Sequence, residues 1–576
     1  MIKTLLKSVR QYKKQTLLSP VFVAGEVILE CMIPLVMSRM IDRMSAESIS
    51  PIIKYGVILL IMATVSLGFG VLSARNAAEA SCGFAKNLRQ DMYFKIQDFA
   101  FADIDKFSAS SLVTRMTTDI TNVQMAYMMS IRLLARAPIM IILSWVMTLV
   151  LNKTVAMLFL IVIPLLGGTL IFIAKKAHPH FIKVFDEYDV LNNSVQENVN
   201  ASRVVKAFVR EDYEIDKFHI ISKYVYSLFT KAEKIVAWNS PVMQFTMYVV
   251  ILVIVAIGGN SIVTGTMQTG ELTSIIVYSL QILMSLMMVT FVFVMIMIAE
   301  ASTDRIAEVL NEEPEMQDSD DAVKDVANGE IIFDHVNFSY AGKDGTLSLK
   351  DVCLHIQSGQ TIGIIGGTGS AKSTLVQLIP RLYDVTGGAV KVGGVDVRNY
   401  NLEALRDQVS MVLQKNVLFS GTIYENIRWG NESATDEEVQ NVCKLAQADG
   451  FVQEFPNGYN TQIVQGGNNV SGGQKQRLCI ARALLKKPKI LILDDSTSAV
   501  DTKTDALIRK AFREEIPDTT KIIIAQRVSS IEDADQIIVL DDGKITGIGT
   551  SKELLKTNEI YREVYESQVK GGAENE

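Results

Sequence analysis

Cysteine is scarce in this sequence. Its 576 residues include only five, which are scattered, odd in number and never spaced as Cys-x-x-Cys: Cys31, Cys82, Cys353, Cys443 and Cys479. This pattern predicts neither a disulfide framework nor a zinc site. It is typical of a chain whose soluble part lies in the cytosol.

An excess of positive charge is also missing. Lys and Arg total 56 and Asp and Glu total 63, which leaves a formal net charge of −7. Proteins that bind nucleic acid use a basic surface to contact the phosphate backbone. The charge balance therefore predicts that nucleic acid is not a partner.

The sequence does combine an apolar composition with many charges. It is 49% hydrophobic and 21% charged, whereas a soluble globular chain is about 45–50% apolar and about 25% charged. A chain made only of membrane spans could not carry this many charged residues. A membrane part joined to a soluble part reconciles the two values.

Six apolar stretches precede residue 300, and each is near the roughly 20 residues that a helix needs to cross a bilayer. Six such runs are too many for the buried helices of a soluble core. The first run follows basic residues but lacks a small-residue cleavage signature, so we predict a retained span and not a signal peptide. The stretches cover residues 17–40, 52–74, 133–151, 155–173, 242–263 and 275–298.

The polar segments predict the orientation and the domain boundaries. Lys and Arg collect in residues 75–127 and 174–241, and such residues favour the cytoplasmic side of a membrane, so both termini are expected in the cytoplasm. We predict a transmembrane domain over residues 1–310 and an acidic, solvated linker over 311–329. In residues 330–576, short β-branched runs alternate with helical patterns, which predicts an α/β domain.

A glycine-rich segment of the α/β domain is typical of a phosphate-binding loop. It follows the strand-like residues 361–365 and precedes a helical pattern, so its backbone N–H groups can converge on phosphate oxygens. Lys372 is expected to reach the β- and γ-phosphates and Ser373 to hold Mg²⁺. Ala371 stands where glycine is expected, and its methyl group would crowd the loop if its φ were positive. The segment consists of Gly366, Gly367, Thr368, Gly369, Ser370, Ala371, Lys372, Ser373 and Thr374.

A second segment supports a nucleotide site. Residues 490–493 form a continuous apolar run that is followed by Asp494 and Asp495. Such a run is typical of a strand buried in a parallel sheet, and Asp494 at its carboxyl end is expected to reach the Mg²⁺. The two segments together predict that the domain binds ATP with Mg²⁺.

With these motifs, the chain resembles exporter-type half-transporters of the ABC transporter superfamily over nearly its whole length. The most specific motif is Val-Ser-Gly-Gly-Gln at residues 470–474, followed by Lys-Gln-Arg-Leu-Cys-Ile-Ala-Arg at 475–482, which matches the ABC signature. Residues 107–123 and 204–208 are similar to the intracellular loops of these exporters. The resemblance implies a type 1 exporter fold, with an all-α domain of six transmembrane helices and an α/β P-loop nucleotide-binding domain.

The resemblance also implies roles for individual residues. Tyr340 matches the aromatic residue that stacks on adenine, and Gln414 matches the Q-loop glutamine at the Mg²⁺. Residues 498–501 match the D-loop, which ends at Asp501. In this family two chains enclose two ATP molecules, so the signature residues are expected to contact the ATP held by the partner: Ser471, Gly472, Gly473 and Gln474.

Two further positions depart from the family pattern. Asp495 stands where the general base is normally glutamate, and Gln526 stands where the family has its switch histidine. Aspartate retracts the carboxylate by roughly 1.5 Å, and misplacement by about 1 Å can cost on the order of 100-fold in rate. Glutamine can hydrogen-bond a phosphate but cannot carry a proton or a positive charge. Either change alone is compatible with activity, but together with Ala371 they predict a degenerate hydrolytic site.

Because the signature is intact, the pattern favours one subunit of a heterodimeric exporter. Its own site would hydrolyse ATP slowly, while its signature would complete the competent site of a different half-transporter. Alternating access would then move drug-like, peptide or lipid substrates out of the cytoplasm, across a bilayer that we expect to be the plasma membrane. The alternatives are a homodimeric exporter with slow hydrolysis at both sites and, less favoured, a nucleotide-gated channel or regulator.

Two carboxylates fall inside the first apolar stretch. Glu26 and Glu30 lie at i and i+4, on one face of a helix. Intramembrane carboxylates are costly and usually face an interior cavity. They are either a cation-preferring part of the substrate path or structural partners of a basic residue such as Arg132 or Arg136, and the sequence leaves both interpretations open.

Overall fold

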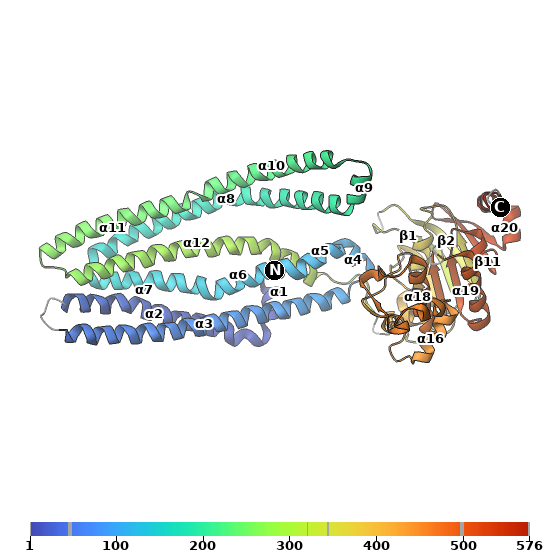
Figure 1. Cartoon of the computed structure of the whole chain (residues 1–576), viewed down its shortest axis with the longest axis horizontal. Coiled ribbons are helices and arrows are strands. Elements are labelled where there is room, and N and C mark those ends of the chain that lie inside the picture. The colour runs from blue at the N-terminus through green and yellow to red at the C-terminus, as the bar shows by residue number, and fades with distance from the viewer. Residues whose placement is uncertain (1, 44–48, 320, 343–344, 496–499, 574–576) are drawn as a thin grey trace. The chain divides into compact units, whose positions relative to one another are not determined.

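The computed structural model describes residues 2–43, 49–319, 321–342, 345–495 and 500–573. They form two compact units (Figure 1). Unit 1 consists of Met1–Gln97 and Ser108–Glu312, and unit 2 consists of Asp98–Phe107 and Glu313–Glu576. A ten-residue segment from the first half of the chain therefore groups with the C-terminal half.

Unit 1 is helical, and six helices among the described residues are long and apolar enough to cross a membrane. Each contains one of the six predicted stretches, so the prediction of six transmembrane helices is confirmed. The helices continue well beyond the apolar windows, because the polar segments that follow are helical too; α3 (Ser50–Gln97), for example, has 48 residues. The six helical stretches are Ile2–Arg43, Ser50–Gln97, Ala109–Leu151, Lys153–Val184, Glu211–Val263 and Thr269–Asn311.

Long helices of unit 1 pack along one another (Figure 1). One apolar cluster joins α8, α11 and α12 through Phe159, Ile254 and Ile282, which are fully buried. The elements of this unit are α1 (Ile2–Leu6), η1 (Lys7–Tyr12), α2 (Lys13–Arg43), α3, α5 (Ala109–Thr114), η2 (Arg115–Asp119), α6 (Ile120–Met129), η3 (Ser130–Leu134), α7 (Ala135–Leu151), α8 (Lys153–Asn200), α9 (Ser202–Ala207), α10 (Glu211–Val236), α11 (Asn239–Val263) and α12 (Thr269–Asn311).

The turn between α7 and α8 is a single residue. Asn152 is extended, with φ −151°, and its side-chain oxygen accepts a hydrogen bond from the Val155 N–H at 3.1 Å. This is a helix N-cap, which satisfies a backbone donor that would otherwise be left free. The Trp145 Nε1–H donates to the Ala156 carbonyl at 3.0 Å and ties the two helices together beside the turn.

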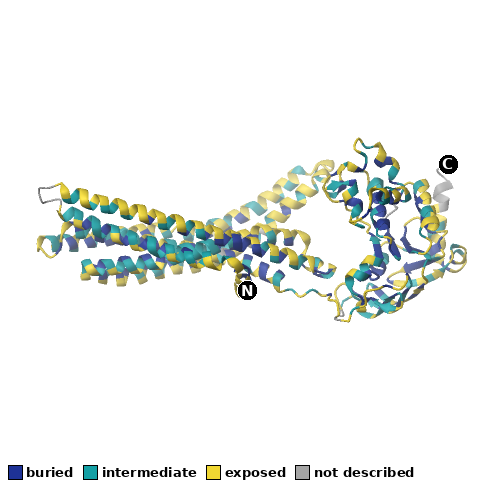
Figure 2. Cartoon of the chain, turned by 90° about the horizontal axis from the view of Figure 1, so that it is seen from below, coloured by how far each residue is buried: buried dark blue, intermediate teal, exposed yellow. Residues whose placement is uncertain are grey.

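Unit 2 is an α/β domain, as predicted. Its six-stranded sheet has the order β12-β11-β3-β10-β9-β6, and all its neighbouring strands are parallel except β11 and β12. A four-stranded antiparallel sheet has the order β2-β1-β4-β5. The apolar run at residues 490–494 is β9, which is buried along its whole length and pairs with β10 and β6. Figure 2 shows the buried residues gathered along these strands.

The strands of unit 2 are β1 (Ile331–Phe338), β2 (Leu349–Ile356), β3 (Thr361–Ile365), β4 (Gly387–Val392), β5 (Val395–Asp396), β6 (Val409–Val412), β7 (Gly421–Thr422), β8 (Gln462–Ile463), β9 (Ile490–Asp494), β10 (Thr520–Ile524), β11 (Gln536–Asp541) and β12 (Lys544–Gly549). Its helices are α4 (Phe101–Phe107), α13 (Lys372–Gln377), η4 (Val397–Asn399), α14 (Leu402–Gln408), α15 (Ile423–Arg428), α16 (Asp436–Leu445), α17 (Asp449–Glu454), η5 (Gly458–Asn460), η6 (Gln465–Gly467), α18 (Gly472–Leu485), α19 (Thr502–Glu515), η7 (Val528–Ser530), α20 (Ser551–Thr557) and α21 (Glu559–Ala573).

The acidic segment after α12 is not solvated along its whole length, contrary to the prediction. Met316 and Val326 are buried. The Asp318 carboxylate accepts hydrogen bonds from the Asn401 side chain at 2.6 Å and from the Leu402 N–H at 2.9 Å, at the start of α14. The segment is therefore partly built into unit 2, since Val326 packs into an apolar core of that unit.

Candidate functional site

The glycine-rich segment lies between β3 and α13. The Lys372 ammonium group donates hydrogen bonds to the carbonyl oxygens of Gly366 at 2.9 Å and Gly367 at 2.7 Å, so the loop curls around it. Burial lowers the pKa of Lys372, while the nearby Asp494 and Asp495 raise it. The loop therefore holds one cation next to two carboxylates, at the amino end of a helix.

Ala371 settles the question that the sequence left about its φ. It adopts a left-handed conformation, with φ 70° and ψ 27°, and immediately precedes α13. A residue with a Cβ atom pays about 1 kcal/mol for this conformation, and glycine does not. The backbone conformation at residue 371 is thus one that favours glycine, but the residue there is alanine, which carries a methyl group.

Two oxygen ligands meet where the loop faces the sheet. The Ser373 hydroxyl donates to Asp494 Oδ1 at 3.0 Å, which joins the first turn of α13 to the carboxyl end of β9. Burial raises the pKa of Asp494, and the hydrogen bond from Ser373 lowers it. A hydroxyl and a carboxylate this close are the hard oxygen donors that Mg²⁺ prefers, and this pair could hold it.

The two residues that depart from the family pattern contact each other. Gln526 follows β10, and its Nε2–H donates to Asp495 Oδ2 at 2.6 Å. Gln414, just after β6, hydrogen-bonds the same carboxylate. Burial raises the pKa of Asp495, and the hydrogen bonds from Gln526 and Gln414 lower it. The Asp495 carboxylate is thus held between two side-chain amides.

Tyr340 lies beside the helix of the loop. Its hydroxyl is 3.0 Å from the Thr374 hydroxyl and donates to Gln377 Oε1 at 3.4 Å. The rings of Phe338 and Tyr383 pack against it edge to face, with centroids at 4.8 and 5.2 Å. Tyr340 is nevertheless 54% exposed, so a planar ligand can reach its ring.

Sequence reasoning missed Tyr383. Its hydroxyl donates to Asp105 Oδ2 of α4 at 2.8 Å, and its ring lies 6.1 Å from that of Phe101. Burial and the contact with Asp105 raise the pKa of Tyr383. The segment Asp98–Phe107 is therefore joined to Tyr340 through one side chain. No spacing rule relates residues 278 positions apart, and an aromatic residue shortly after the loop helix was the only available signal.

The signature residues begin α18. Ser471 is its N-cap: the Ser471 hydroxyl oxygen accepts from the Gln474 N–H at 3.3 Å, and the Gln474 side chain accepts from the Ser471 N–H at 2.9 Å. Ser471 and Gly472 are exposed. An exposed helix start with a hydroxyl and free N–H groups attracts anions, and Gly473 and Gln474 form the rest of its first turn.

The D-loop prediction is only partly covered by the structure. Residues 498 and 499 lie outside the described residues, and Asp501 is the N-cap of α19. Its carboxylate accepts from the Thr504 N–H at 2.9 Å, and this hydrogen bond lowers the pKa of Asp501. The visible role of Asp501 is to begin a helix.

In unit 1 the two intramembrane carboxylates share one arginine. Arg136 of α7 donates to Glu26 Oε1 at 2.7 Å and to Glu30 Oε2 at 2.5 Å. This is the arrangement expected of structural partners. Two carboxylates facing one guanidinium carry a formal charge of −1, and among the described residues none hydrogen-bonds the buried Glu26 Oε2.

Comparison with known proteins gives consistent matches over the chain. The family model described as "ABC transporter transmembrane region" matches residues 16–286, and the one described as "ABC transporter" matches residues 349–498. An uncharacterized ABC transporter ATP-binding protein of Bacillus subtilis, YfiB, is 37% identical over 544 residues, which is 94% of each chain.

Two further relatives are named for lipid-like substrates. An ATP-dependent lipid A-core flippase of Desulfotalea psychrophila is 33% identical, with 82% of this chain and 84% of the relative covered. A fatty acid ABC transporter ATP-binding/permease protein of Mycobacterium bovis is 32% identical, with 82% and 75% covered.

The fold is also found among solved structures. One of them is that of a bacterial Atm1-family ABC exporter with ATP bound, which matches with a TM-score of 0.85 over 96% of this chain and 99% of that chain. The sequence identity is 22%, so this likeness concerns the fold.

Proposed function

This chain belongs to the ABC transporter family, with an exporter-type transmembrane region joined to an ABC ATPase domain, and from that premise we propose that it is one subunit of a heterodimeric ATP-driven exporter. Its own ATP site hydrolyses slowly, and its signature completes the competent site of a different half-transporter. The observation that carries the proposal is the hydrogen bond between Gln526 and Asp495 at 2.6 Å.

That contact bears on hydrolysis directly. A general base must be within hydrogen-bond reach of the water it activates, and the switch residue must contact the γ-phosphate. In this chain the short Asp495 carboxylate accepts from Gln526 and from Gln414. The carboxylate that would activate water and the side chain that would contact the γ-phosphate are therefore hydrogen-bonded to each other. In addition, glutamine cannot supply the positive charge of an imidazolium.

The groups that bind nucleotide are, in contrast, all present. Lys372 and the loop N–H groups would hold the phosphates, and Tyr340 would stack on the adenine ring. Ser373, Asp494 and Gln414 would hold Mg²⁺, which neutralises charge on the β- and γ-phosphates when it is bound. The short distance of 3.0 Å between the Ser373 hydroxyl and Asp494 supports this assignment.

The proposed transport cycle is alternating access in the plasma membrane, with both termini and the ATPase domain in the cytoplasm. ATP bridged between the P-loop of one chain and the signature of the other draws the two domains together, and hydrolysis at the competent site resets them. The Lys- and Arg-rich segments 75–127 and 174–241 support this orientation.

We propose that the substrate is hydrophobic or amphipathic, with lipid-like molecules as the favoured class. The names of the two relatives with lipid and fatty acid substrates support this class. Glu26 and Glu30 would contribute the one uncompensated negative charge of the Arg136 cluster to the substrate path. That negative charge would favour a cationic group on the substrate, whether the substrate is lipid-like, drug-like or a peptide.

The experiment starts by isolating the chain from its native membranes with whatever half-transporter accompanies it. ATPase activity is then compared for Asp495→Asn in this chain and for a Gln substitution at the corresponding catalytic glutamate of the partner. We expect the first change to leave turnover within about twofold and the second to abolish it. Loss of turnover with Asp495→Asn alone, or full activity from a complex of identical chains, would identify the homodimeric exporter instead.

A further inference from the structure

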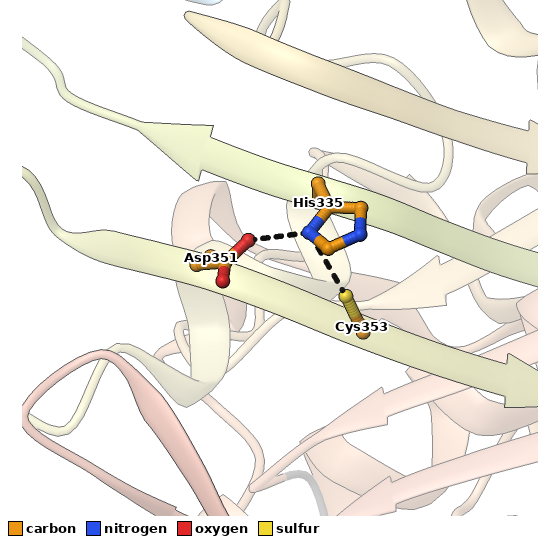
Figure 3. Close-up of side chains that lie close together, drawn as sticks. All are labelled: His335, Asp351 and Cys353. Atoms are coloured by element: carbon orange, nitrogen blue, oxygen red, sulfur yellow. Dashed lines mark hydrogen bonds and ion pairs between the residues drawn. The ribbon is translucent and has the colours of Figure 1, made fainter.

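Three side chains with different metal-binding atoms lie together on the exposed face of the four-stranded sheet. His335 comes from β1, and Asp351 and Cys353 come from the neighbouring strand β2 (Figure 3). His335 Nδ1 is 2.7 Å from Asp351 Oδ1 and 3.5 Å from Cys353 Sγ. All three residues are exposed, and their ligand atoms lie within 4.8 Å of one another.

The backbone turns these side chains toward each other. The pairing of β1 with β2 is irregular at two places: Asp334 and His335 together oppose Cys353, and Lys350 and Asp351 together oppose Asn337. These are β-bulges, which insert an extra residue and re-aim a side chain. His335 and Asp351 are the residues with positive φ at the two bulges, 48° and 51°.

A positive φ raises the conformational free energy of residues with a Cβ atom, and glycine would adopt it with less strain at both bulges. Two such residues therefore face each other across one strand pair, and each carries a potential metal ligand. The distorted backbone places an imidazole, a carboxylate and a thiol on one surface.

We propose that His335, Asp351 and Cys353 form a binding site for a zinc-like divalent ion, with water in the fourth position. Imidazole nitrogen, thiolate sulfur and carboxylate oxygen are the donors that proteins use for Zn²⁺. In a tetrahedral site with Zn–N of about 2.05 Å and Zn–S of about 2.3 Å, the nitrogen and sulfur are about 3.5 Å apart. The observed separation of Nδ1 and Sγ is 3.5 Å.

The carboxylate needs only a small movement. Tetrahedral Zn²⁺ would separate nitrogen and oxygen by about 3.4 Å, whereas Nδ1 and Oδ1 are now 2.7 Å apart in a hydrogen bond. Both side chains are exposed, at 72% and 69%, so they can open by this amount without disturbing a packed core. Binding would release the thiol proton and replace the hydrogen bond by two metal–ligand bonds.

A nucleophilic relay is the other chemistry that Cys, His and Asp can perform, and the geometry disfavours it. In such a relay the nucleophile and the orienting carboxylate contact opposite nitrogens of the imidazole. Here both contacts converge on Nδ1 (Figure 3). Convergence on one nitrogen is what shared coordination of an ion requires.

The cysteine spacing argued against a zinc site, and the reason is now evident. Zinc motifs are recognised in sequence by closely spaced cysteines or histidines. His335 and Cys353 are 18 positions apart on different strands, so their proximity depends on the pairing of β1 with β2. The proposal goes beyond the transport function and does not depend on it.

The same strand pair offers a matched control. His355 of β2 contacts Glu330 at 2.8 Å, next to the start of β1, and both are at the surface. This pair has an imidazole and a carboxylate, but among the described residues it is not part of a cluster of three metal-binding groups. Cys82, which is also exposed, controls for thiol chemistry elsewhere.

The test uses the full-length protein in detergent, with any affinity tag removed and without nucleotide, because ATP itself chelates zinc. Zn²⁺ binding is measured by competition with a chromophoric chelator, and Co²⁺ serves as the spectroscopic probe. We expect one tight site per chain and a thiolate-to-cobalt charge-transfer band in the near ultraviolet. Cys353→Ser should remove the band, and Cys353→Ser and His335→Ala should each weaken Zn²⁺ binding by about 100-fold or more, since even outer-sphere changes cost about 10–100-fold.

The controls decide between this site and adventitious binding. Cys82→Ser and His355→Ala should retain the band and the affinity of the unmodified chain. ATP binding by each variant reports that it is folded, and Asp351→Asn provides a second ligand change if Cys353→Ser does not fold. The proposal is overturned if the unmodified chain shows no charge-transfer band, or if the ligand variants bind Zn²⁺ as tightly as the two control variants.

Discussion

The two sides of the ATP site differ in how closely they follow the family. On the binding side, Lys372 lies within the glycine-rich loop and Ser373 contacts Asp494 at 3.0 Å. On the proposed hydrolytic side, Asp495 and Gln526 stand where the family pattern has glutamate and histidine, and Gln526 donates a hydrogen bond to Asp495. Nucleotide binding and hydrolysis use different atoms of one site, so one can be kept while the other is lost. The comparison predicts a chain that holds ATP well and cleaves it poorly.

The signature should give the largest effect, because in the proposed heterodimer it completes the competent site of the partner. Gly472→Asp places a carboxylate at the exposed start of α18, where the γ-phosphate is expected. We expect turnover of the complex to fall by about 100-fold or more, as for loss of a group that stabilises transition-state charge. Steady-state ATPase assays measure this effect.

Gly450→Asp is the matched control for that substitution. Gly450 is an exposed residue of α17, and an added Cβ atom there would meet nothing within 4 Å. It should leave turnover unchanged. If Gly472→Asp were equally harmless, this signature would not contribute to the active site.

Restoring the hydrolytic side should give the next largest effect. In a complex whose partner site is disabled, Asp495→Glu with Gln526→His is expected to raise the residual ATPase rate by up to about 100-fold, since the carboxylate regains its reach and the imidazole can carry charge. Single-turnover hydrolysis of bound ATP measures it. Gln526→His alone keeps the shorter carboxylate of Asp495 and is the control, and it should stay slow; equal rates in both variants would mean that the length of Asp495 does not limit hydrolysis.

The binding side can be broken by removing the loop lysine. Lys372→Ala deletes a charge that is proposed to contact phosphate, and a hydrogen bond to a charged group is worth about 1.5–3 kcal/mol or roughly 10–150-fold in affinity. Equilibrium binding of a fluorescent ATP analogue to this chain measures the loss. Lys444→Ala, a change of an exposed residue on α16, should not alter binding, and an unchanged affinity for Lys372→Ala would contradict the phosphate role.

The smallest effect concerns the backbone of the loop. Ala371→Gly removes the cost of a left-handed residue with a Cβ atom, about 1 kcal/mol, and should raise the unfolding temperature by about 2–4 °C. Ala446→Gly makes the same change at an ordinary φ of −79° and should lower it. Thermal unfolding of the full chain compares the two. A lower unfolding temperature for Ala371→Gly would show that the methyl group packs favourably.

Local patterns in the sequence were sufficient for much of the fold and part of the site. The six apolar stretches predicted the six helices among the described residues that are long and apolar enough to cross a membrane, because helix length in a bilayer depends only on consecutive residues. The loop between β3 and α13 and the buried strand β9 were found for the same reason. The sequence also identified Asp495 and Gln526 as departures from the family pattern, but it did not show that these two side chains contact each other.

Contacts between residues far apart in the chain could not be predicted from the sequence. Two basic residues were candidates as the partner of Glu26 and Glu30, and the packing of α2 against α7 selected Arg136. The link from Asp105 through Tyr383 to Tyr340 joins residues 278 positions apart, and its only signal in the sequence was an aromatic residue shortly after the loop helix. The segment Asp98–Phe107 groups with unit 2 because of such contacts.

The amino-acid sequence by itself determined that this is a membrane chain with an ATP-binding domain, because span length, loop composition and the glycine pattern are properties of neighbouring residues. Only the tertiary structure decided which altered residues meet, as with Gln526 and Asp495, and which scattered ligands converge, as with His335 and Cys353. Strand pairing and β-bulges bring such residues together, and no periodic pattern along the chain predicts these contacts.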